Sequence, residues 1–97
     1  MKIVWLAFAQ QDIASISAYH ETSANKEVAH RVIRHIVHSA SALIENPHLG
    51  RPSESVDGIH ELRVAHVPYL LPYRVIGDQI EILRVFHDAQ DRPSTWR

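Results

Sequence analysis

The spacing of apolar residues predicts a strand and then a helix at the start of the chain. Residues 3–6 form a short apolar run of β-prone side chains, which becomes a strand only by joining a sheet built elsewhere. From Ala9 the apolar positions recur at helical spacing as far as Tyr19, with polar residues between them. We expect a first helix there, ending near residues 20–22.

A second helix is the clearest pattern in the sequence. Residues 22–25 carry side chains that can cap a helix start, and the helix is predicted to end at Asn46 because Pro47 pushes that residue out of the α region. Basic and polar residues occupy one face of this segment. The opposite face carries an apolar stripe of about four turns, made by Val28, Ala29, Val32, Ile33, Ile36, Val37, Ala40, Leu43 and Ile44.

Beyond this helix the pattern changes to that of strands. Residues 47–58 contain glycine, proline and serine without periodicity, which predicts a connecting loop. Apolar and polar residues alternate over positions 61–66, as in a half-buried strand, and Pro68 interrupts this run. The next strand is predicted over Tyr69–Ile76, where Pro72 indicates a gap or bulge in the hydrogen-bond ladder.

The last predicted strand follows a tight turn. Gly77-Asp78 supplies the left-handed backbone that a two-residue hairpin requires. Residues 80–86 are apolar on both faces apart from Glu81 and Arg84, so this strand belongs inside the sheet. The resulting β-α-α-β-β-β order predicts an α+β fold, in which a two-helix hairpin packs on one face of a mainly antiparallel four-stranded sheet.

Composition narrows the possible classes of protein. A chain of 97 residues with 45% hydrophobic side chains builds one core, so residues 1–97 are expected to form a single domain. The absence of cysteine excludes disulfides and thiolate chemistry, and no apolar run is long enough to cross a membrane, so a cytoplasmic protein is expected. The net charge of −1 indicates that any role with nucleic acid needs a local basic patch.

Histidines on the second helix raise the question of a metal site. His35 and His38 lie three positions apart, and His30 extends the row. Arg31 and Arg34 adjoin them, and neither a cysteine nor a well-placed carboxylate completes a tetrahedral set. We therefore expect a solvated helix face, with no metal and no other cofactor.

Several short motifs are specific in combination. Ile3-Val4-Trp5 stands before a helix that carries Asp12-Ile13 and Ile16. The later motifs are Asn46-Pro47 followed by Leu49-Gly50-Arg51, then Glu61-Leu62-Arg63-Val64, Pro68 to Val75, Ile82 to His87, and Arg92-Pro93 to Trp96. Over essentially its whole length the sequence thereby resembles the ParE/RelE superfamily, the toxins of bacterial type II toxin–antitoxin modules.

The resemblance implies one of two activities on one fold, so the site has to decide between them. RelE-like members cleave messenger RNA on the ribosome, and ParE-like members inhibit DNA gyrase by binding it. The ribonuclease branch carries an arginine directly after the aromatic position of the third strand and a tyrosine near the C-terminus. This sequence has Leu70 and Trp96 there, which cannot pair with a phosphate or exchange a proton at neutral pH. The chain is therefore closer to ParE, and no catalytic residue is expected.

The ribonuclease alternative stays open with named residues. His87 would act as general acid or base with Glu61 as its counterpart, and Arg63 or Arg84 would hold the phosphate. The same resemblance implies a small ParD-like antitoxin as a partner, with DNA gyrase as the target. No membrane and no sequence-specific nucleic-acid contact are expected.

The antitoxin is expected to bind through a tail that folds on the toxin. Such a tail would fill the groove between the helix pair and the sheet edge with apolar anchors, and its acidic groups would pair with arginines. Alternatively, those arginines form ion pairs with Glu54, Glu61, Glu81 and Asp88 of the chain itself. The residues predicted to contact antitoxin or target are Arg51, Arg63, Tyr69, Arg74, Arg84, His87 and Trp96.

Overall fold

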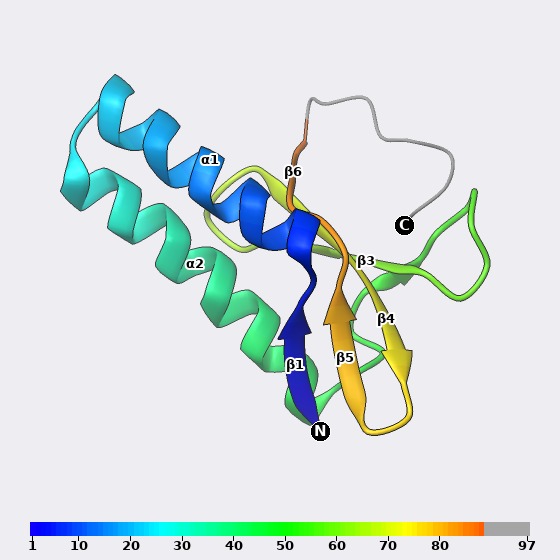
Figure 1. Cartoon of the computed structure of the whole chain (residues 1–97). Helices are drawn as coiled ribbons and strands as arrows, with labels where there is room; N and C mark the ends of the chain where they lie inside the picture. Colours follow the sequence, from blue (N-terminus) through cyan, green and yellow to red (C-terminus); the bar gives the residue numbers. More distant parts are fainter. Residues whose placement is uncertain (89–97) are drawn as a thin grey trace.

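The computed structural model describes residues 1–88, so Trp96 lies outside the described residues. Two helices pack as a hairpin on one side of a mixed sheet (Figure 1). The sheet order is β1-β5-β4-β3-β2, with β6 also paired to β4, and only the β1–β5 pair is parallel. The elements are β1 Lys2–Trp5, α1 Ala7–Ser23, α2 Lys26–Glu45, β2 Arg51–Pro52, β3 His60–Arg63, β4 Tyr69–Ile76, β5 Gln79–Ile82 and β6 Phe86–His87. The predicted fold class is confirmed.

The second helix begins and ends where local chemistry directs it. The side chain of Asn25 caps α2, because its Oδ1 accepts a hydrogen bond of 2.9 Å from the backbone N–H of Val28. At the other end Asn46 leaves the helix before Pro47, as predicted. The first helix starts at Ala7, two residues earlier than expected, without a side-chain cap. Only residues 24–25 separate α1 from α2, and the two helices lie antiparallel (Figure 1).

The sheet holds six strands, where the sequence predicted four. One addition is β2, which lies in the predicted loop and pairs Arg51 with Glu61. The other arises because the last predicted strand is interrupted between β5 and β6. The register pairs Tyr73 with Ile82 but Leu70 with Phe86, so the three residues 83–85 lie opposite two residues of β4. This is a bulge.

Pro72 explains where the interruption falls. Its carbonyl accepts a hydrogen bond of 2.9 Å from the N–H of Leu83, which places its backbone on the β5 side of β4. Proline has no N–H to return to that neighbour, so the ladder breaks there. The gap or bulge predicted at Pro72 is confirmed, and so is the hairpin turn, where Gly77 has a φ of +59°. The strand predicted over positions 61–66 ends earlier, at Arg63, and His66 has a φ of +74°, which no extended strand accommodates.

The main core lies between the helices and the sheet, and one buried tyrosine ties the chain after α2 to it. Tyr73 is fully buried, donates its hydroxyl proton to the carbonyl of Pro47 at 2.8 Å, and accepts from the N–H of Gly50 at 2.9 Å. A Cβ at Gly50 would lie 2.6 Å from the Tyr73 ring, so only glycine fits there. Burial raises the pKa of Tyr73, and the hydrogen bond from Gly50 partly lowers it.

A smaller apolar cluster lies on the sheet face opposite the helices. It consists of Ile59, Leu83 and Phe86, with Leu6 and Val56 packed against them. The loop that carries Val56 thus covers part of that face. No helix within residues 1–88 combines the length and apolar character that crossing a membrane would need.

Candidate functional site

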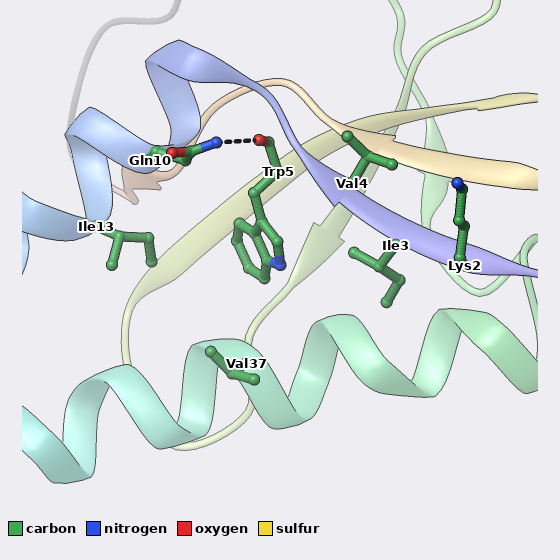
Figure 2. A pocket seen from close by; sticks show the side chains of 7 residues that line it. All are labelled: Lys2, Ile3, Val4, Trp5, Gln10, Ile13 and Val37. Atoms are coloured by element: carbon green, nitrogen blue, oxygen red, sulfur yellow. Dashed lines mark hydrogen bonds between the residues drawn. The ribbon is translucent and has the colours of Figure 1, made fainter.

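A groove runs along the outer side of β1, the edge strand of the sheet. It encloses about 650 Å³ and is lined by Lys2, Ile3, Val4, Trp5, Gln10, Ile13 and Val37. Three elements form its walls: β1, the first turns of α1, and the middle of α2 (Figure 2). The sequence predicted a groove between the helix pair and the sheet edge, and this one has that position.

The apolar wall of the groove comes from alternation along β1. Ile3 and Trp5 point from the strand toward Val37 on α2, whereas Lys2 and Val4 lie on the other side of the ribbon (Figure 2). Val37 and Ile44 were predicted in the buried stripe of the second helix, but they are 45% and 42% exposed. The apolar stripe of α2 is therefore wider than the surface that packs against it. Its outer residues, Val37 and Ile44, stay exposed in the folded chain.

The outer backbone edge of β1 also offers hydrogen-bonding groups. Lys2 and Leu6 donate their N–H groups to carbonyls on the β5 side, at 3.2 and 3.0 Å. Because alternate residues face opposite edges, the backbone groups of Ile3 and Trp5 face outward, away from β5. The carbonyl of Trp5 accepts a hydrogen bond of 2.8 Å from the amide of Gln10, which closes the end of the edge (Figure 2). The groove thus combines an open strand edge with an apolar wall.

The structure brings three of the four predicted arginines to one face of the sheet. Leu62 packs in the main core, so Arg63 beside it points to the opposite face, which the helices leave open. The same alternation puts Arg74 and Arg51 on that face. Arg84 does not join them, because the bulge at residues 83–85 directs it toward α1.

Most of these arginines already have partners in the chain. Arg63 pairs with Asp88, and the Nε of Arg74 donates to Glu81 at 2.7 Å. The hydrogen bond from Arg74 lowers the pKa of Glu81. These are two of the ion pairs that the sequence proposed as the alternative to an antitoxin contact. Within residues 1–88, Arg51 forms no ion pair.

The partner of Arg84 is Asp12, a pairing that the sequence analysis missed although Asp12 belongs to one of its motifs. Two guanidinium nitrogens donate to the carboxylate at 2.8 and 3.1 Å, and the N–H of Val85 donates to it at 2.8 Å. The hydrogen bond to Asp12 raises the pKa of Arg84. Arg84 also lies over the rings of Phe86 and Phe8, at 4.7 and 5.5 Å from their centroids. This arginine fastens α1 to the bulge.

Tyr69 and His87 lie on the helix side of the sheet. Their rings meet edge to face with centroids 5.4 Å apart, and the Tyr69 hydroxyl is 3.0 Å from Nε2 of His20 on α1. Burial, followed by the nearby Tyr19, raises the pKa of Tyr69. Tyr69 is only 5% exposed, so its main contacts are internal.

The four residues of the ribonuclease alternative do not meet at one point. Glu61 and Arg63 point to the open face of the sheet, and His87 lies with Tyr69 on the helix face. Arg84 is held by Asp12. General acid–base chemistry on RNA requires its groups within hydrogen-bonding reach of one substrate, and these side chains are divided by the sheet.

Comparison with known proteins agrees with this geometry. Residues 3–92 match the family described as "ParE toxin of type II toxin-antitoxin system, parDE". The chain belongs to the ParE toxin family. This ParE-family chain is 37% identical to a Sinorhizobium fredii protein named "Putative toxin Y4kP" over 92 residues, which cover 95% of this chain and 93% of that one.

A solved structure supports the same assignment. The chain resembles the "Chromosomal ParDE TA system from P. aeruginosa" with a TM-score of 0.81 and 31% sequence identity, over 90% of this chain and 95% of the other. The resemblance to the ParE branch that the motifs indicated is confirmed. The ParE-family chain is accordingly a toxin of a type II toxin–antitoxin module.

Proposed function

We propose that this ParE-family toxin acts by binding DNA gyrase and is neutralised by a cognate ParD-like antitoxin seated in the β1 groove. The observation that carries the antitoxin site is the open edge of β1 beside exposed apolar side chains of α2. An extended segment can add to such an edge through its main chain and place alternate side chains on the apolar wall. The solved P. aeruginosa structure is that of a ParDE system, which supports a partner of this kind.

Binding rather than catalysis is proposed for the action on the target. The groups that RNA cleavage would need are divided between the two sheet faces, and Arg84 is engaged by Asp12. Leu70 is 5% exposed and apolar where the ribonucleases carry an arginine. A protein that works through its surface shape requires no acid–base pair.

The antitoxin site is tested by one substitution with a matched control. Val37→Glu places a charge on the apolar wall, and burial of a valine contributes about 1.5–3 kcal/mol. Affinity for the antitoxin should fall between roughly tenfold and 150-fold by isothermal titration calorimetry, since each 1.4 kcal/mol is a factor of ten. Ile76→Glu is the control, because Ile76 is 51% exposed at the β4–β5 hairpin, away from the groove. Equal loss in both variants would remove the groove from the proposal.

The target is tested with purified gyrase. The toxin should inhibit supercoiling of a relaxed plasmid at micromolar concentration, and addition of antitoxin should restore activity. A translating extract supplied with the same toxin should show no cleavage of messenger RNA. Cleavage in the extract without inhibition of gyrase would assign the protein to the ribonuclease class.

A further inference from the structure

The second helix carries two arginines that the fold leaves without counter-charges. Arg63, Arg74 and Arg84 each pair with a carboxylate. By contrast, Arg31 and Arg34 form no ion pair and no hydrogen bond through their side chains within residues 1–88, and both are exposed. Their charge is therefore available to an external anion.

These arginines belong to a longer row, which we call the cation row: Arg31, Arg34, His35, His38 and His66. The first four stand at positions i, i+3, i+4 and i+7 of α2 and so share one face of the helix. His66 joins from the β3–β4 loop, where its ring lies 4.9 Å from that of His35, centroid to centroid. The loop is held to α2 by a hydrogen bond of 3.2 Å from the N–H of Ala65 to the hydroxyl of Ser39.

The charges around the cation row do not neutralise its centre. Glu27 lies one turn before Arg31 and Glu45 lies two turns after His38, so acidic residues stand only at the two ends of α2. A pair of like charges at this spacing destabilises a helix by about 0.2–0.5 kcal/mol. Glu27 offsets part of that cost at Arg31, but no acidic residue of α2 lies one turn from Arg34. A bound anion would offset the cost there.

We propose that the cation row binds the phosphate backbone of nucleic acid without regard to base sequence. The guanidinium fork of arginine fits a phosphate with two parallel hydrogen bonds, and a straight, exposed helix face can follow a backbone. The row contains no Trp, Tyr or Phe and no large aliphatic side chain, which are the usual anchors of a protein–protein interface. Such a contact goes beyond the proposed antitoxin and gyrase interactions. Because the net charge is −1, binding of nucleic acid needs a local basic patch, and the cation row is such a patch.

The number of charges sets the expected salt dependence. The two arginines are charged at all relevant pH values, so each can neutralise one phosphate. Since log K falls with log salt at about −0.9 per neutralised phosphate, the slope should be about −2. Binding at physiological salt should be weak, with a dissociation constant of about 10⁻⁴–10⁻⁶ M.

Fluorescence anisotropy with a 20-base-pair duplex of arbitrary sequence tests the proposal on the whole chain. Arg34→Glu should weaken binding by at least about tenfold at 50 mM salt and reduce the slope by about 1. Arg51→Glu is the matched control, because it makes the same change of charge on an exposed arginine of β2 and should alter the affinity by less than about twofold.

Three results would overturn the proposal. One is equal weakening by the Arg34 and Arg51 variants, which would mean that only net charge matters. Another is a slope near zero, which would mean that no phosphate is neutralised. The third is capture of a polyglutamate peptide in preference to the duplex, which would assign the row to an acidic protein. Far-UV circular dichroism monitors the fold, and Arg34→Gln replaces the Glu variant if that one does not fold.

Discussion

The Asp12–Arg84 pair offers a quantitative test of how the first helix is held. Asp12 lies in α1, and Arg84 lies in the bulge between β5 and β6, 72 positions later in the chain. The carboxylate accepts three hydrogen bonds, two from the guanidinium and one from the N–H of Val85. The side chains of Arg84 and Asp12 are 30% and 17% exposed, so water replaces these bonds only in part. We expect Asp12→Ala to destabilise the fold strongly.

The size of the effect follows from these contacts. A hydrogen bond to a charged group contributes about 1.5–3 kcal/mol, and a buried donor left without a partner costs about 1–3 kcal/mol. The two guanidinium bonds act as one bidentate unit, and partial exposure reduces both quantities. We therefore expect Asp12→Ala to lower the free energy of unfolding by about 2–4 kcal/mol. Asp12→Asn retains an acceptor for the N–H of Val85 and should cost less, about 1–2 kcal/mol.

A double-mutant cycle measured by urea unfolding isolates the pair. Asp12→Ala, Arg84→Met and the double variant should give a coupling energy of about 1–3 kcal/mol, since Arg84→Met keeps much of the contact with the neighbouring rings. Asp57→Ala serves as a control, because Asp57 is exposed in the loop after β2. A coupling below about 0.5 kcal/mol would refute the argument that this pair fastens α1 to the sheet.

Three further predictions concern Gly50, Glu81 and Tyr73. Gly50→Ala should cost about 2–4 kcal/mol in urea unfolding, because its Cβ would lie 2.6 Å from the buried ring of Tyr73; an unchanged midpoint would contradict this. The pKa of Glu81 is lowered, so its pair with Arg74 stabilises the fold above about pH 4.5, and this stabilisation is lost as the pH falls through the folded-state pKa. The difference in unfolding free energy between wild type and Arg74→Ala should therefore shrink from pH 7 to pH 3. The raised pKa of Tyr73 contributes stability below about pH 10 that is lost at higher pH, and Tyr73→Phe should weaken this alkaline dependence in thermal unfolding monitored at 295 nm.

Local patterns in the sequence carried enough information for the elements and their order. The helix at α2, the stop at Asn46, the hairpin at Gly77 and the break at Pro72 each depend on a few neighbouring residues, and each is confirmed. The short strand β2 was missed because it exists only through tertiary contacts. Gly50 packs against Tyr73, and this contact sets Arg51 beside β3. No periodicity can show a strand of two residues.

The candidate site was less accessible to sequence reasoning. Val37 was assigned to the core because a helical stripe shows which residues share a face but not how wide the opposing surface is. Arg84 was grouped with the sheet arginines because the bulge that turns it toward Asp12 cannot be located from strand alternation. The groove position was anticipated, whereas its α2 wall and the cation row depend on how the helix is rotated against the sheet.

The two unsatisfied surfaces of α2 lie on different sides of the helix and should therefore act independently. At 100° per residue, Val37 and Ile44 lie about 110° and about 130° around the axis from the centre of the four α2 residues of the cation row. The apolar side faces β1, and the row points toward solvent and His66. Val37 lies three positions after Arg34, so the two surfaces are separated by a neutral change and by the arginine farther from the groove. Val37→Ser should weaken antitoxin binding without changing the affinity for duplex DNA, and Arg31→Glu should do the reverse. If either substitution impaired both interactions equally, one partner would cover both sides of the helix. The cation row would then bind acidic side chains of the antitoxin and not phosphate.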